Sequence, residues 1–152
     1  MVAPSQMDDD ICKPTEGRGL NTGEQLSQDS KKFIHGDITE KIVLSIYNVF
    51  NQLKYGYPEK IYQRALALEF DKHGLKYQKE CYGKILYDGK IIGRYYLDFL
   101  VEDRVAVELK VRREMYDTDW IQLLNYIKSK DLRVGILAVF TKFEPKIKRL
   151  VN

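Results

Sequence analysis

The stretch Gly93–Val111, GRYYLDFLVEDRVAVELKV, contains two apolar runs on either side of a short polar turn. β-Branched and aromatic runs bounded by turn residues predict two antiparallel strands. With the turn centred on Asp103, Asp98 directly faces Glu108 on the neighbouring strand. Strand alternation places Lys110 on the same face as Glu108. The stretch therefore predicts one sheet face that carries two opposed carboxylates and an ammonium group.

This charged face has two possible interpretations. Like charges opposed across two strands are unfavourable, and a divalent cation between them would reverse that penalty. The lysine could then orient or help deprotonate a water, or stabilise charge on a phosphate. Alternatively, Asp98, Glu108 and Lys110 form the solvated side of an ordinary hairpin. The apolar residues around Glu108 indicate an inner strand, where charges are costly unless they are paired or functional, and they favour the first interpretation.

The remaining elements follow from apolar periodicity. Asp88-Gly89 is a strong signal for a hairpin turn. Asp37 with Glu40 fits a capping box at the start of a helix. The basic tail Pro145–Val151 is expected to be a short helix or irregular. The expected helices are 37–54, 58–73 and one around 120–127, and the expected strands are 77–87, 90–101, 105–111 and 132–140. The order ααβββαβ describes an α/β or α+β domain with a mixed sheet and flanking helices, in which the last strand follows a parallel crossover.

Composition limits the classes to which the chain can belong. Its 152 residues suffice for one domain, and its net charge of +3 permits a polyanionic partner without requiring one. No apolar run reaches the roughly 20 residues that span a bilayer, and the first residues lack a signal-peptide core, so we expect a cytoplasmic protein with no membrane partner. Residues 1–36 are polar and aperiodic, which predicts a disordered tail before a domain at 37–152.

Two further motifs lie on the expected helices. Gly56, Glu59 and Tyr62 form G-x-x-E-x-x-Y, in which Glu59 either contributes another carboxylate to the site or only favours the positive end of its helix. Gln122 and Tyr126 are expected to share a polar flank of the crossover helix that overlooks the site.

These motifs together resemble the GxxExxY proteins, a branch of the PD-(D/E)xK nuclease superfamily. The resemblance covers about Ile38 to Val151. The chain departs from the family pattern in three places: Asp119 stands where the family often has histidine, Tyr96 stands where it often has arginine, and the region before Gly56 lacks the common His-Glu-rich helix end. The resemblance rests on the ordered segments GYPEKIY at 56–62, ALALEF at 65–70, GRYYLDFLVED at 93–103, VELK at 107–110, QLLNY at 122–126 and VGIL at 134–137.

The resemblance implies a restriction-endonuclease-like core and a Mg²⁺ (or Mn²⁺) site. Its implied metal ligands are Asp98, Glu108, Glu59 and the Leu109 carbonyl, with Lys110 as the catalytic lysine. The residues expected to contact the substrate are Gln122, Tyr126, Tyr62 and Arg94.

The expected function is metal-dependent hydrolysis of phosphodiester bonds in DNA, with RNA as the alternative substrate. A second copy of the chain or another protein is the expected protein partner. The alternative is a catalytically inactive module on the same fold that binds nucleic acid or protein. A third interpretation is a small structural domain whose charged hairpin is coincidental.

Overall fold

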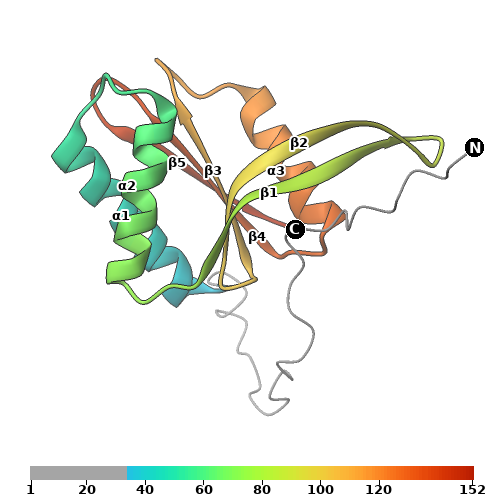
Figure 1. Cartoon of the computed structure of the whole chain (residues 1–152), viewed down its shortest axis with the longest axis horizontal. Coiled ribbons are helices and arrows are strands. Elements are labelled where there is room, and N and C mark those ends of the chain that lie inside the picture. Colours follow the sequence, from blue (N-terminus) through green and yellow to red (C-terminus); the bar gives the residue numbers. More distant parts are fainter. Residues whose placement is uncertain (1–33) are drawn as a thin grey trace, which may run out of the picture.

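A computed structural model describes residues 34–152 (Figure 1). The predicted mixed sheet with flanking helices is confirmed. One five-stranded sheet has the order β1-β2-β3-β4-β5, which is the order of the chain. The elements are α1 (Gly36–Leu53), α2 (Glu59–Lys72), β1 (Tyr77–Tyr87), β2 (Lys90–Val101), β3 (Val105–Val111), α3 (Asp117–Ser129), β4 (Val134–Phe140) and β5 (Pro145–Val151). Among the described residues, no helix is both long and apolar enough to span a bilayer.

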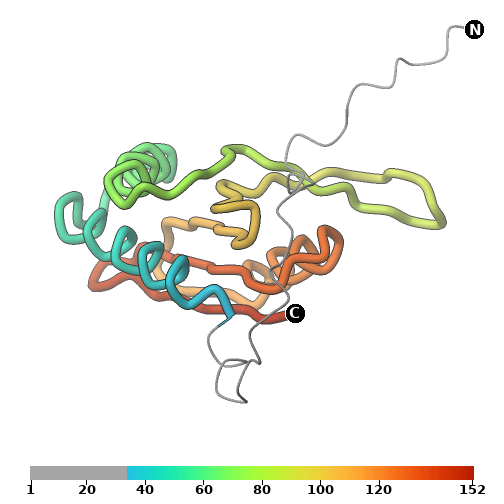
Figure 2. Tube along the Cα trace, turned by 90° about the horizontal axis from the view of Figure 1, so that it is seen from below, coloured from blue at the N-terminus to red at the C-terminus, as the bar shows by residue number. Residues whose placement is uncertain are grey.

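The β1–β2 hairpin has the bounds that the sequence predicts. Its strands meet at Asp88-Gly89, where both residues have the positive φ that such turns require. The hairpin is long, and its outer half projects beyond the helices (Figures 1 and 2). Its inner half joins the sheet, because β2 pairs with β3 from Phe99↔Val107 to Val101↔Val105.

The centre of the sheet is the parallel pair β3–β4, which matches the predicted crossover. The pairing runs from Val105↔Val134 to Val111↔Phe140. Every residue of β4 is buried, as expected for a strand that is covered on both faces. One apolar cluster joins α1 and α2 to one face of the sheet, and a second joins α3 to the other face.

Two predictions about the ends of elements are wrong. Residues 145–151 form β5, antiparallel to β4, so the order is ααβββαββ. In β5, Ile147 alternates with exposed or partly exposed basic residues, as suits a protected edge strand. The capping box is absent, because α1 starts at Gly36 with Asp37 inside its first turn. Ile34, just before α1, is connected to β5, because its carbonyl accepts a hydrogen bond from Arg149. The rest of the expected tail, residues 1–33, lies outside the described residues.

Helix α3 is rotated relative to the prediction. Its fully buried residues are Leu123, Tyr126 and Ile127, whereas Trp120 and Leu124, which were expected on the core stripe, are only partly buried. The rotation brings the Tyr126 ring edge-on to Tyr95 of β2, with ring centres 5.7 Å apart. Tyr126 therefore does not share a polar flank with Gln122, which is exposed.

Close packing of α3 against β4 depends on Gly135. A Cβ atom there would lie 3.1 Å from Leu123 Cγ and 3.2 Å from Ile127 Cγ2. We expect Gly135→Ala to lower the free energy of unfolding by about 1–3 kcal/mol, because both side chains must shift in a packed core. Urea unfolding measures this change. The control is Gly93→Ala, whose nearest contact would be an ordinary 3.4 Å, and equal effects of the two substitutions would contradict the packing argument.

Candidate active site

The site begins where β2 separates from β3. Their ladder ends at Phe99↔Val107, so Asp98 is not paired directly with Glu108 as the sequence predicted. The Asp98 carboxylate replaces the next ladder bond, because its Oδ2 accepts the Leu109 N–H at 2.7 Å. The aspartate is thereby held against the backbone of the strand that carries Glu108.

Glu108 and Lys110 share one face of β3, as strand alternation predicts. Glu108 is buried, with 7% of its surface exposed. Its Oε1 lies 3.1 Å from Lys110 Nζ, and the Lys110 side chain keeps 21% of its surface exposed. The positive charge of Lys110 therefore offsets only part of the negative charge of Asp98 and Glu108.

Burial dominates the electrostatics of this cluster. Burial, and then the charge of Glu59, raise the pKa of Asp98 to about 6, although the Leu109 N–H opposes the shift. Burial, and then the Asp98 carboxylate, raise the pKa of Glu108 to about 8. Burial acts to lower the pKa of Lys110, but Glu108 outweighs it and raises that pKa. The lysine therefore stays protonated, while burial and neighbouring carboxylates disfavour the ionisation of Asp98 and Glu108.

These shifts predict how the stability of the metal-free protein depends on pH. Each carboxyl group has a higher pKa in the folded than in the unfolded chain, so between about pH 4.5 and 8 the folded state holds more protons. The free energy of unfolding should therefore fall as pH rises through this window, by on the order of a few kcal/mol. Urea unfolding in EDTA across the window measures the slope.

Glu108→Gln is the control for this slope, because it removes the group with the larger shift. Burial lowers the pKa of His35, which gives a slope of opposite sign, so the difference between wild type and variant isolates the carboxylates. A wild-type slope that matches the variant's would show that folding does not raise the pKa of Glu108.

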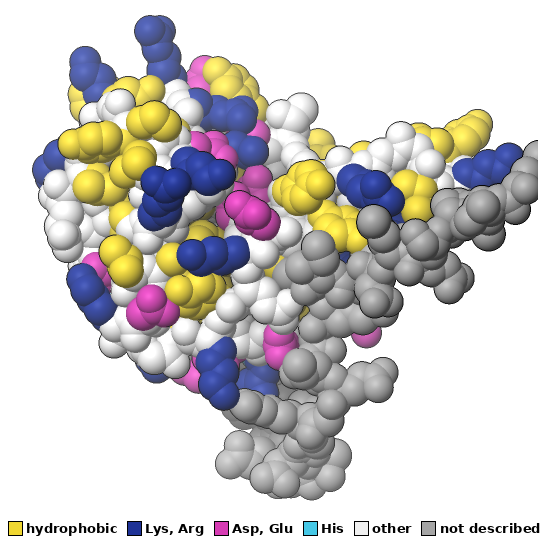
Figure 3. All heavy atoms as spheres, viewed as in Figure 1, with side chains coloured by type: hydrophobic (Ala, Val, Ile, Leu, Met, Phe, Trp, Pro, Cys, Tyr) yellow, Lys and Arg dark blue, Asp and Glu magenta, His cyan; other side chains and the backbone are white. Residues whose placement is uncertain are grey.

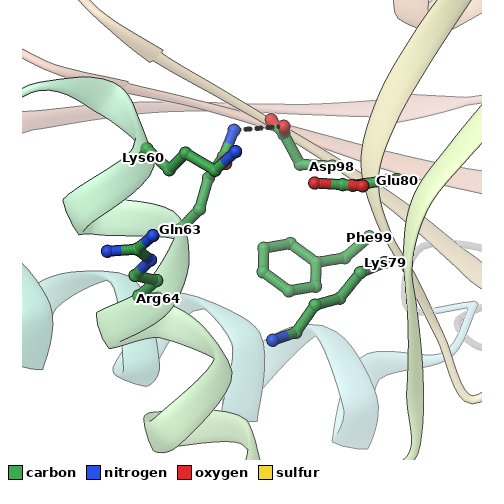
Figure 4. Close-up of a pocket in the computed structure, with 7 residues that line it drawn as sticks. All are labelled: Lys60, Gln63, Arg64, Lys79, Glu80, Asp98 and Phe99. Carbon is green, nitrogen blue, oxygen red and sulfur yellow. Dashed lines mark hydrogen bonds between the residues drawn. The ribbon is translucent and has the colours of Figure 1, made fainter.

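Helix α2 brings a further carboxylate and an amide towards Asp98. Glu59 is the first residue of α2, and Gln63 lies one turn later. The Gln63 Nε2 donates to Asp98 Oδ1 at 2.5 Å and lies 3.5 Å from Glu59 Oε1, so its amide stands between the two acids (Figure 4). Sequence reasoning missed Gln63, although its i, i+4 spacing from Glu59 places both on one helix face.

A small pocket opens beside Asp98, between α2 and the inner half of the hairpin (Figure 4). It has a volume of about 160 Å³. Its lining residues are Lys60, Gln63 and Arg64 from α2, Lys79 and Glu80 from β1, and Asp98 and Phe99 from β2. Only Asp98 of this set was among the predicted site residues, because the pocket depends on how α2 docks against the sheet.

The chemistry of the donors fits a hard divalent cation. The cluster offers carboxylate oxygens, which Mg²⁺ and Mn²⁺ prefer, and a cation would offset the repulsion between Asp98 and Glu108. Within residues 34–152, however, no three His, Cys, Asp or Glu side chains lie close enough together to hold a metal ion. The Gln63 amide accounts for this spacing, because it occupies the space between Glu59 and Asp98.

The predicted substrate-contacting residues occupy different environments. Tyr62 is fully buried, donates its hydroxyl to the Lys54 carbonyl and stacks on Phe140, which identifies it as a core aromatic. Tyr126 is also fully buried. Arg94 and Gln122 are exposed on β2 and α3. The two tyrosines are therefore not presented to a substrate in this structure.

The geometry can now be compared with known proteins. A family model described as the PD-(D/E)XK nuclease superfamily matches residues 36–150. The chain belongs to this superfamily. No curated protein matches the chain. Among solved structures, the chain is similar to the one titled "Crystal structure of SSO0001", at 18% identity and with a TM-score of 0.44. The match covers 61% of this chain and 49% of that protein, so the chain spans about half of its length.

Membership of the PD-(D/E)XK nuclease superfamily agrees with the fold, a five-stranded mixed sheet with three helices. Superfamily members are typically nucleases, which act on nucleic acid and generally use divalent metals. Asp119 has a structural role in this fold. It is buried, pairs with Arg112 at 3.0 Å and accepts the Tyr116 N–H at 3.1 Å, which fixes the start of α3 near the end of β3.

Proposed function

We propose that this protein is a Mg²⁺-dependent nuclease that hydrolyses phosphodiester bonds in DNA, with RNA as the alternative substrate. The observation that carries the proposal is the cluster of Asp98, Glu108 and Lys110 where β2 and β3 separate, in which Glu108 is buried and the other two are partly buried. Carboxyl groups whose pKa is raised by burial and by neighbouring negative charge are costly to ionise, and a divalent cation offsets that cost.

Asp98, Glu108 and the Leu109 carbonyl would hold Mg²⁺, and Glu59 would join them if the Gln63 amide moves aside. When bound, the metal would polarise the phosphoryl oxygen and lower the pKa of a water. Lys110 stays protonated beside Glu108, so we assign it to orienting the water and stabilising developing negative charge rather than to removing a proton.

The hairpin supports a path for the nucleic-acid strand. Arg94 and Tyr96 precede Asp98 along β2, and alternation places all three on one face of that strand. The Arg94 guanidinium lies 5.8 Å from the centre of the Tyr82 ring, and Tyr96, which is 65% exposed, packs against Tyr82. Exposed aromatic rings stack with bases, and arginine contacts phosphates. We assign Gln122 to a more distant contact from α3.

One observation favours the alternative of a catalytically inactive module. In the described part of the chain, no trio of metal-ligating side chains is assembled, and Gln63 is hydrogen-bonded to Asp98 instead. Such a module would bind nucleic acid in a salt-dependent manner without requiring a metal. We favour the nuclease, because a degenerate site would be expected to lose the lysine or a carboxylate first.

We also propose that the chain belongs to the GxxExxY branch, that it is cytoplasmic, and that it acts with a second copy of itself or another protein partner.

The deciding experiment is isothermal titration of Mn²⁺ into wild type and Asp98→Ala, with cleavage of single- and double-stranded DNA and RNA followed in the same buffers. We expect saturable binding and metal-dependent cleavage by wild type, and neither in the variant. Metal-independent nucleic-acid binding without cleavage would support the inactive module. The absence of any interaction with metal or nucleic acid would leave only the structural domain.

A further inference from the structure

The pocket between α2 and the hairpin has an uneven distribution of charge. Its acidic groups, Asp98 and Glu80, lie together, whereas the basic residues Lys60, Arg64 and Lys79 extend along α2 and β1 (Figure 4). In the space-filling view, which has the orientation of Figure 1, basic and acidic side chains adjoin one another beside α2 (Figure 3). A group bound in the pocket therefore has carboxylates near one end and cations around the rest.

The three basic residues of the pocket are not neutralised by ion pairs within the part of the chain that the structure describes. None of Lys60, Arg64 and Lys79 takes part in one, although Lys79 Nζ lies 5.8 Å from the centre of the Tyr77 ring. Lys60 and Arg64 are also i, i+4 neighbours on α2, a spacing at which like charges destabilise a helix. An anion bound between them would remove this repulsion.

The size of the pocket restricts what that anion can be. Pockets that enclose a small organic molecule have volumes of about 300–1,000 Å³, and a water molecule takes up about 30 Å³ of liquid. A pocket of about 160 Å³ accommodates a single tetrahedral group but not a whole nucleotide. Arginine and lysine side chains are typical phosphate-binding groups.

We propose that this pocket binds a phosphate group of the nucleic-acid strand, adjacent to the phosphodiester that is cut. The inference rests on the proposed function, because it places the pocket beside a carboxylate, Asp98, that would hold the metal. Arg64 and Lys79 contact the phosphate oxygens, with Lys60 on the same side of α2. The phosphate is either an internal phosphodiester or a terminal phosphomonoester, which share the same chemistry.

The test is equilibrium binding of single-stranded DNA with an internal fluorescent label, measured by anisotropy over a series of KCl concentrations. Ca²⁺ replaces Mg²⁺, and a gel checks that the DNA stays intact. The variants are Lys60→Gln, Arg64→Gln and Lys79→Gln. The control, Lys41→Gln, removes an exposed cation of α1 that is also outside any ion pair among the described residues. All four side chains are exposed, so circular dichroism should show unchanged folds.

We expect each pocket variant, but not the control, to bind roughly 3- to 10-fold more weakly and to lower the slope of log K against log salt by about 0.7. Three DNAs separate the two sources of phosphate. Equal losses on 5′-phosphorylated, 5′-hydroxyl and circular strands identify an internal phosphodiester, whereas a loss confined to the 5′-phosphorylated strand identifies a terminal phosphate. Either result supports the proposal.

Two outcomes would overturn the proposal: pocket variants that bind like Lys41→Gln, or a wild type that binds none of the three DNAs. The outcome is separable from the nuclease proposal. Normal binding and cleavage by the pocket variants would remove the phosphate site and leave the nuclease intact. Binding that depends on the pocket, with no cleavage in Mg²⁺ or Mn²⁺, would retain the phosphate site and remove the nuclease.

Discussion

Asp98→Asn is expected to abolish cleavage, with a loss of at least about a thousand-fold, because it removes a charged metal ligand. The same change should raise the free energy of unfolding of the metal-free protein by about 1–2 kcal/mol, since one of two opposed carboxylates disappears. The asparagine can still accept the Leu109 N–H, and the Gln63 amide can rotate to pair with it. Activity and stability should therefore change in opposite directions.

The measurements are gel-based cleavage in Mg²⁺ and urea unfolding in EDTA and in Mg²⁺. Glu114→Gln is the matched control, because it neutralises an exposed acid of the loop after β3. In Mg²⁺ the wild type should gain stability that Asp98→Asn does not gain. Stabilisation by Asp98→Asn to the same extent with and without Mg²⁺ would instead indicate a structural domain without a metal site.

Lys110→Met is expected to reduce the cleavage rate by about 10²- to 10⁴-fold, the range typical of a positioned group that assists proton transfer or stabilises charge. Metal binding should persist, because Asp98 and Glu108 remain, and the loss of the ammonium group removes a competitor for Glu108. A large fall in rate with unchanged or tighter Mn²⁺ binding is the expected signature.

Single-turnover cleavage and Mn²⁺ titration separate these two effects. Lys41→Met is the control, because it removes an exposed lysine outside the site and should retain the wild-type rate. Full activity in Lys110→Met would show that the lysine only balances the charge of Glu108. Loss of metal binding as well as rate would show that Lys110 maintains the shape of the site rather than the chemistry.

The local parts of the site could be predicted from the sequence. Asp88-Gly89 and the turn around Asp103 define the strand bounds, and an alternation of two residues puts Glu108 and Lys110 on one face. These features depend on neighbouring residues only. The membership of the superfamily followed from the same motifs.

Features that depend on docking between distant elements were not predictable in the same way. The ladder between β2 and β3 ends at Phe99↔Val107, and the expected pairing of Asp98 with Glu108 is replaced by the bond from the Leu109 N–H to Asp98. The rotation of α3 depends on Gly135 of β4, which admits Leu123 and brings Tyr126 into the core. Apolar periodicity along one helix carries no information about such partners.

The order of the sheet has a consequence for folding kinetics. Asp98 and Glu108 lie on strands that are consecutive in the chain, so their hairpin can form while both carboxylates are still hydrated. Repulsion between them becomes costly only when α2 and β4 exclude water, which is a late step. Interactions that are absent from the transition state change the unfolding rate rather than the folding rate. Bound divalent metal should therefore slow unfolding and leave the refolding rate unchanged.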